Sequence, residues 1–330
     1  MGNHTKTMMR HAALAVALSA LLSGAHPAAA GKGKIMSHAA EAAILQFRNG
    51  VRYQPPPTGF LKEGKLEVEE LEPFGPALRR EAGPVREQIV RLLADAGKRS
   101  DPMYTAGGQM IRQPRIIAML AGEGIVHADL GREAALGAMQ QYVPAELLKP
   151  YGKVLTNDLK ERPGTTAFLL IAKVKPPEAV PVVRKLMTAP RWPKELNARV
   201  AAAALWEKDI EKEFIDCFRE AADPKEKARL ARVLGWIGTD AALRALADAM
   251  RTDLVIEMPR VSRRSVRLDV LAALSYNFPD QQALYESQLL DEEGYDQAEA
   301  FCVKRFGTKW DTPRPPFLTI MGFPIPRRTR

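Results

Sequence analysis

Apolar positions in the second half of the chain recur every three or four residues, which is the spacing of one buried helix face. In the segment RLARVLGWIGTD, Leu230, Val233, Leu234 and Ile237 fall at positions i, i+3, i+4 and i+7. Residues 240–250 repeat this spacing. No stretch alternates apolar and polar positions long enough to indicate a strand, so the sequence predicts an all-α fold.

These helical segments return as one phrase: a basic residue, an alanine-rich helix, a turn and a leucine-rich helix. The phrase begins at Arg86, Arg132, Thr166, Arg199, Arg229 and Arg267. Its mean step is about 36 residues, within the range of periods that indicates a solenoid. A pair of short helices cannot bury its apolar faces alone, so neighbouring pairs stack into one continuous core.

The repeat is clearest over residues 224–290. There LGWIGTDAALRALADAM and SVRLDVLAALSYNFPDQQALYESQL combine a V-R-x-x-A-x-x-A-L helix, a G-x-x-D/P turn and an A-L-x-x-L helix. This pattern resembles HEAT repeats, and more narrowly the HEAT-like repeats named after phycobilisome lyases. The resemblance implies an α-solenoid of stacked antiparallel helix pairs. It does not imply one activity, since this repeat serves scaffolds, lyases, hydroxylases and nucleic-acid enzymes.

Residues 1–30 have the tripartite pattern of a secretory signal peptide. Lys6 and Arg10 precede an apolar run over residues 12–22, and small residues over 28–30 precede Gly31. A membrane anchor is the alternative, but this run is about half of the roughly 20 residues that a spanning helix needs. The sequence therefore predicts cleavage after residue 30, export to the periplasm or the extracellular space, and no transmembrane segment in the mature chain.

The rest of the chain divides into three predicted parts. Residues 31–66 form an N-terminal segment with a short helix and a proline-rich linker. Residues 67–306 form the HEAT-like solenoid of about seven helix pairs. Residues 307–330 form a proline-rich basic tail that is either disordered or strapped along the last repeat.

The net charge limits the kind of partner, and the small number of histidines limits the catalytic chemistry. Removing residues 1–30 lowers the formal charge from +9 to +7, which favours an anionic partner. In an exported protein that partner is a protein or an anionic cell-envelope polymer rather than nucleic acid. The mature chain keeps only His38 and His127, and it has no metal-ligand spacing and no phosphate-binding loop. We therefore predict no cofactor, no metal and no catalytic residue.

The two cysteines, Cys217 and Cys302, both lie on apolar helical faces. Free cysteine is among the most frequently buried residue types. We therefore expect both cysteines to be buried and unbridged.

Arginines recur near the first turn of the second helix of each pair, where positive charge opposes the helix dipole. The predicted ladder consists of Arg86, Arg132, Arg199, Arg229 and Arg267. Carboxylates of neighbouring units are the expected partners, as in the Asp–Arg ladders of similar HEAT-like proteins. The candidate carboxylates are Asp209, Asp223 and Asp240.

Further basic residues gather at the turns within the helix pairs, which stacking aligns along one rim. The candidate partner-binding residues are Arg191, Trp192, Lys194, Arg251, Arg260, Arg263 and Arg264. Such a rim is either a solvated basic edge or a site for an acidic ligand, and the sequence leaves both open.

Two functions remain after this reasoning. The first is an exported, non-catalytic scaffold that binds its partner through the extended helical surface. The alternative is a lyase-like or base-excision-like enzyme on the same repeats, working with a carboxylate and aromatic residues alone. The residues that would serve it are Trp192, Trp206, Trp236 and Asp240. The sequence does not set the oligomeric state.

Overall fold

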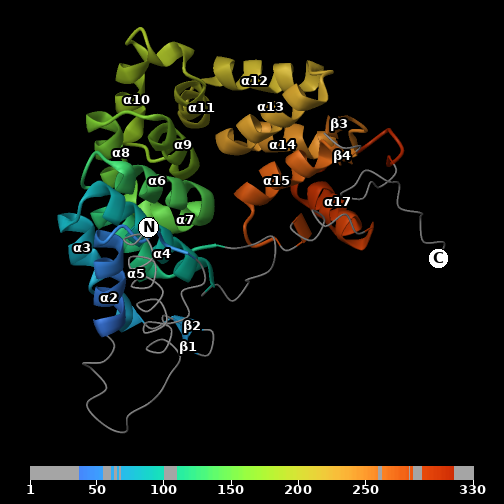
Figure 1. The fold of residues 1–330 in the computed structure, drawn as a ribbon. Coiled ribbons are helices and arrows are strands. Elements are labelled where there is room, and N and C mark those ends of the chain that lie inside the picture. Colours follow the sequence, from blue (N-terminus) through green and yellow to red (C-terminus); the bar gives the residue numbers. More distant parts are fainter. Residues whose placement is uncertain are drawn as a thin grey trace, which may run out of the picture.

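A computed structural model describes residues 37–54, 61–62, 65–66, 68–99, 110–258, 262–281, 283–284 and 292–315. Within these ranges the chain is a succession of helices that pack side by side in chain order (Figure 1). The all-α fold class predicted from the sequence is confirmed, and the packing of successive helices fits a solenoid. The predicted signal peptide and residues 316–330 of the predicted tail lie outside the described ranges.

The α-helices have these bounds: α2 (Ser37–Arg48), α3 (Phe74–Arg80), α4 (Gly83–Arg99), α5 (Pro114–Ala118), α6 (Leu130–Tyr142), α7 (Ala145–Leu148), α8 (Gly152–Glu161), α9 (Thr165–Val174), α10 (Ala179–Met187), α11 (Leu196–Leu205), α12 (Lys208–Glu220), α13 (Pro224–Ile237), α14 (Asp240–Asp248), α15 (Arg267–Asn277) and α17 (Glu292–Phe306). Shorter helical turns are η2 (Val68–Leu71), the π-helical η3 (Met119–Glu123), η4 (Lys149–Tyr151), η5 (Trp192–Lys194) and η6 (Ala249–Arg251). The strands are β1 (Leu61–Lys62), β2 (Lys65–Leu66), β3 (Val255–Met258) and β4 (Ser262–Ser265).

The helices form two rows. In the inner row each helix packs on the next, in the order α4, α6, α9, α11, α13 and α15. In the outer row each helix packs on the inner helix that follows it in the chain, and this row consists of α3, α8, α10, α12 and α14. Because an amphipathic helix this short cannot bury its apolar face alone, each inner helix needs its outer partner and its row neighbours.

The array bends at α11 and forms two arms (Figure 1). The first arm, residues 37–205, runs from α2 to α11, and the second arm, residues 208–315, runs from α12 to α17. Helix α11 packs on α9 in one arm and on α12 and α13 in the other. Residues 201–204 of α11 are four buried alanines, whose small side chains let helices approach closely at the bend.

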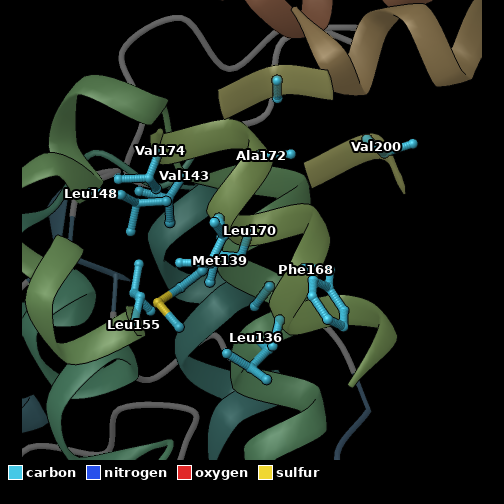
Figure 2. Close-up of a cluster of buried hydrophobic side chains, with 14 of the residues drawn as sticks. Leu136, Met139, Val143, Leu148, Leu155, Phe168, Leu170, Ala172, Val174 and Val200 are labelled. Atoms are coloured by element: carbon cyan, nitrogen blue, oxygen red, sulfur yellow. The ribbon is translucent and has the colours of Figure 1, made fainter. Parts of the chain in front are cut away.

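The core of the first arm is centred on α9, as Figure 2 shows. Leu136 and Met139 of α6 meet Phe168 and Leu170 of α9, and all four side chains are buried. Helix α9 is buried on most of its circumference because it packs on α6, α8, α11 and α13. This explains why its sequence, TTAFLLIAKV, is apolar nearly all round rather than along one stripe.

Two short antiparallel hairpins interrupt the helices, and the sequence did not predict either. The larger one pairs β3 with β4, with Val255 opposite Ser265. It lies in the long connection between α14 and α15 and packs Ile256 and Val266 against Ala228 of α13. Its four-residue strands are too short for an alternating pattern to stand out from the surrounding helices.

The end of the described chain lies along the last helices. The indole Nε1 of Trp310 donates to the carbonyl of Asp248 at 3.2 Å, and Arg251 donates to the carbonyl of Thr312 at 2.7 Å. Among the described residues no helix is both long and apolar enough to cross a membrane. Both cysteines are free, and Cys302 is buried as predicted, but Cys217 is exposed on α12 because it faces away from the row.

Candidate functional site

Arg86 of α4 is a fully buried cation near the start of an inner helix. Its guanidinium donates to the Asp129 carboxylate at 2.6 Å and to the carbonyl of Gly124 at 3.0 Å. Asp129 is the N-cap of α6, and Gly124 follows the last residue of η3. Gly131 of α6 lies against this side chain, since an added Cβ would stand 2.6 Å from the Cβ of Arg86. Arg86 thus joins two helix ends of the next repeat.

Arg132 of α6 has the same arrangement one repeat later. It forms a bidentate ion pair with Asp158 of α8, with N–O distances of 2.9 and 2.7 Å, and the side chain of Asp158 is only 2% exposed. It also donates to the carbonyl of Arg162, the C-cap of α8, at 2.8 Å. The pairing carboxylate is therefore Asp158 and none of the three predicted from the sequence.

Arg199 and Arg229 are not buried in this way. Arg199 pairs with Glu213 at 2.5 Å and lies over the ring of Phe214, and its partner is exposed. Arg229 pairs with Glu226 of its own helix, and both side chains are exposed. In α13 the structure instead buries Lys227, whose Nζ donates to the carbonyls of Phe218 and Arg219 at the end of α12.

Arg267 is the buried cation of α15. It donates to Ser265 Oγ at 3.1 Å and to the carbonyl of Pro315 at 3.3 Å, and it lies 5.5 Å from the ring centre of Tyr295. The carboxylates predicted for the ladder have other roles. Asp223 caps α13, Asp240 pairs with Arg305 at 3.0 Å, and Asp209 lies exposed in the first turn of α12.

Trp192 is placed inside the core and not on the predicted basic rim. Its side chain is 8% exposed and its ring centre lies 5.1 Å from that of Phe168. Arg191 covers the indole from outside, with its guanidinium 4.4 Å from the ring centre. Lys194 is exposed beside them. The predicted surface position of Trp192 is therefore wrong. Burying the large apolar ring is more favourable than leaving it exposed beside its polar sequence neighbours.

The other predicted rim residues lie in and beside the β3–β4 hairpin. Arg251 is held by Glu299 of α17, at 3.0 Å from each carboxylate oxygen. Arg264 pairs with the buried carboxylate of Asp269 at 2.7 Å, while Arg263 pairs with exposed Glu257 at 3.2 Å. Arg260 lies outside the described residues.

The exposed cations that remain near the starts of inner helices form a surface that we call the basic edge. It consists of Arg191, Lys194, Lys225, Arg263 and Arg264. These residues precede or begin α11, α13 and α15, which are neighbours in the inner row. The basic edge therefore has residues in both arms.

The residues of the enzyme alternative line neither of the two grooves that the structure shows most clearly. Trp192 is in the core, Trp206 is half-buried with Arg184 over its ring, and Trp236 is half-buried on α13. Asp240 is exposed at the start of α14, with a side chain 80% open to solvent. The ring nitrogen of His127 lies 2.8 Å from the carbonyl of Arg79. Within the described ranges there is no group of three or more residues that could hold a metal ion.

The two arms touch at a second place, which sequence reasoning missed. Lys173 of α9 donates to the carbonyl of Gln140 at 2.6 Å and lies over the ring of Tyr276, 4.6 Å from its centre. The hydroxyl of Tyr276, on α15, donates to the same carbonyl at 3.2 Å. Burial lowers the pKa of Lys173 to about 7. Lys175 adds a bond to the carbonyl of Gly238 at 2.6 Å.

A lysine whose pKa lies near neutrality is a candidate nucleophile. In Lys173, however, the amine is occupied by a carbonyl and an aromatic ring from two other helices. Neither of the grooves described next includes it among its lining residues. The contact between Lys173, Gln140 and Tyr276 is therefore a structural one that joins the arms, and we call it the arm clasp.

Two grooves mark the surface of the described residues. One lies between α12 and α14 and is lined by charged residues around Ile215 and Ala241. The other lies between α2 and α4, where Phe47, Tyr53 and Leu130 contribute to its walls. Neither groove is lined by a tryptophan.

Comparison with known proteins adds no assignment. No protein-family model matches the chain, and neither a curated protein nor a solved structure matches it. The function has to be inferred from the chain's own surfaces.

Proposed function

We propose that the mature protein is an exported, HEAT-like scaffold that binds a protein or an anionic cell-envelope polymer through the basic edge. The observation that carries this proposal is that exposed cations precede or begin three neighbouring inner helices, α11, α13 and α15. Lys194 and Lys225 lie on it with no ion pair to another described residue. A surface cation without an ion pair does not have to break one before it binds, so it is available to an anionic partner.

The arrangement of the buried cations supports the same proposal. Arg86, Arg132 and Lys227 bind helix ends inside the array and are unavailable to a ligand. The basic edge is a separate set of cations on the surface, so solenoid cohesion does not account for it. Stacked repeats create the extended surfaces that solenoid proteins use for binding.

The edge is tested by charge reversal with a matched control. The test variant carries Lys194→Glu and Lys225→Glu, and the control carries Lys153→Glu and Lys160→Glu on exposed positions of α8. Both change the net charge equally. Envelope extracts are passed over each immobilised protein, and retained proteins and polymers are identified by mass spectrometry.

The expected result is a partner that wild type and the α8 control retain and that the edge variant loses. Weaker retention at higher salt is expected as well, because exposed charges are screened. If the edge variant and the control retain the same partners as wild type, the basic edge is not the binding surface. Export is checked separately, since N-terminal sequencing of the secreted chain should begin at Gly31.

A further inference from the structure

The groove between α12 and α14 lies between two helices of the outer row, and none of its lining residues belongs to the basic edge. Lys208, Lys212 and Arg219 of α12 fall at spacings of four and seven, so they share one helix face. A helix rises about 1.5 Å per residue, which makes this face about 16 Å long. The groove is thus as long as three turns of a helical peptide.

Some cations of the groove are already paired. Lys208 binds Glu211 at 2.6 Å, and Lys212 binds Asp216 within α12. Arg219 and Arg244 differ from them, since their guanidinium groups form no ion pair with any other described residue. A guanidinium group presents two parallel N–H donors that match a carboxylate, which makes these arginines the available binding groups of the groove.

An apolar floor lies between the charged residues. Ile215 of α12 is 7% exposed, and Ala241 of α14 is exposed with a side chain of one carbon. Both residues line the groove together with the two arginines. A ligand that uses the whole groove therefore combines carboxylates with an apolar residue.

The groove's own carboxylates distinguish between classes of anionic ligand. Asp216 lies between Lys212 and Arg219 along the face of α12. A polymer with a negative charge on every unit would place one of those charges against the Lys212–Asp216 pair, whose cation already has a carboxylate partner. A protein segment can space its carboxylates to avoid that position. The pattern therefore favours an acidic peptide over a uniform polyanion.

We infer that the α12–α14 groove binds an acidic amphipathic segment of a partner protein. Arg219 and Arg244 bind its carboxylates, and Ile215 and Ala241 receive an aliphatic side chain in the helix-in-groove mode. This inference rests on the proposed scaffold function and specifies a partner chemistry for it. It uses none of the residues of the basic edge, so the two binding surfaces can fail separately.

The test uses a fluorescein-labelled 16-residue helical peptide with glutamates on one face and leucines beside them, read by fluorescence anisotropy. The Arg219→Gln, Arg244→Gln double variant should weaken binding about tenfold or more, because two charge-assisted pairs are lost. The Lys153→Gln, Lys160→Gln control removes equal charge and should change the affinity less than about threefold. Equal weakening in both variants would show non-specific attraction and overturn the inference.

A second variant tests the shape of the groove without changing charge. Ala241→Gln fills the floor of the groove at an exposed position of α14. It should lower the affinity for the peptide at least about fivefold, the order of magnitude of one lost contact site. Unchanged binding would mean that the peptide does not occupy the groove. Inorganic polyphosphate serves as the polyanion probe, and tighter binding of polyphosphate than of the peptide, lost in the arginine double variant, would also overturn the inference. Urea unfolding of each variant verifies that its fold is retained.

Discussion

The two arms solve the same electrostatic problem with different groups. Both bury a cation near the start of an inner helix, where the helix dipole disfavours positive charge. In the first arm Arg86 and Arg132 face the carboxylates of Asp129 and Asp158. In the second arm Lys227 faces only carbonyls and the ring of Phe218, 4.5 Å from its centre.

The feature common to both arms is the set of carbonyls and not the carboxylates. Each of these cations donates to the carbonyls at or just beyond the last turn of a neighbouring helix. Those carbonyls have no partner within their own helix and carry its negative dipole end. The buried cation therefore caps a neighbouring helix, and the carboxylate is an addition found at Arg86 and Arg132 but not at Lys227.

The largest expected effect is in the first arm. Arg132→Met leaves the buried Asp158 carboxylate with Arg162 alone, 3.0 Å away and partly exposed. Removing one partner of a buried ion pair costs about 3–5 kcal/mol. Because Arg162 still pairs with Asp158, the expected loss is at the low end of this range, about 3 kcal/mol. Urea unfolding measures the change.

The double variant Arg132→Met, Asp158→Asn separates charge from packing. Removing the buried charge together with its partner should recover part of the lost stability, since no unpaired ion remains. A double variant as unstable as the sum of its single changes would contradict the role given to Asp158.

The matching change in the second arm should cost less. Lys227→Met removes donors to the carbonyls of Phe218 and Arg219 but leaves no buried carboxylate without a partner. A lost hydrogen bond to a charged group costs about 1.5–3 kcal/mol, and the lower end of that range is expected because no buried carboxylate is left without a partner. If Lys227→Met costs as much as Arg132→Met in the same urea assay, the carboxylate does not explain the difference between the arms.

The arm clasp predicts a pH dependence of similar or smaller size. Burial lowers the pKa of Lys173 to about 7, against 10.5 for an ordinary lysine. Between those values the unfolded chain binds more protons than the folded chain, so the free energy of unfolding rises with pH. From about pH 6.5 to 8.5 this lysine should contribute a rise of about 2 kcal/mol.

Lys173→Met should remove that contribution, so its urea midpoint should change less with pH than that of wild type. Lys175 and Lys227 provide the background, since burial lowers the pKa of both and both remain in the variant. A pH slope equal to that of wild type would show that Lys173 is solvated and that the clasp is open in solution.

Local patterns predicted the helices well because helix burial is decided within a few residues. The spacing of Leu230, Val233, Leu234 and Ile237 was enough to orient α13, and all four are buried. The arm clasp was beyond this reasoning. Gln140 and Tyr276 are 136 residues apart, and their contact depends on the curvature that many repeats accumulate.

Two cations of the predicted ladder, Arg199 and Arg229, are not buried, for a subtler reason. Arginine recurs in the repeated phrase at Arg199 and Arg229, so the repeat did not indicate Lys227, two positions before Arg229. Helix phase decides it. Lys227 faces the end of α12, and Ala228 faces the hairpin. Arg229 is the next residue, rotated by about 100° around the helix axis, and its side chain faces solvent. Trp192 was wrongly predicted to lie on the surface because its sequence neighbours are charged, although its own ring is buried.

The smallest effect is expected where the sequence placed the ladder and the structure does not. Arg229→Ala breaks only an exposed pair within α13, and Arg199→Ala breaks a half-exposed pair with Glu213. Exposed ion pairs contribute about 0–1 kcal/mol, so each change should cost under about 0.5 kcal/mol in the urea assay. Arg229→Ala and Lys227→Met lie two residues apart in one helix and both remove a positive charge. A larger loss for Arg229→Ala than for Lys227→Met would mean that the surface pair, and not the carbonyl cap, holds α13 to its neighbours.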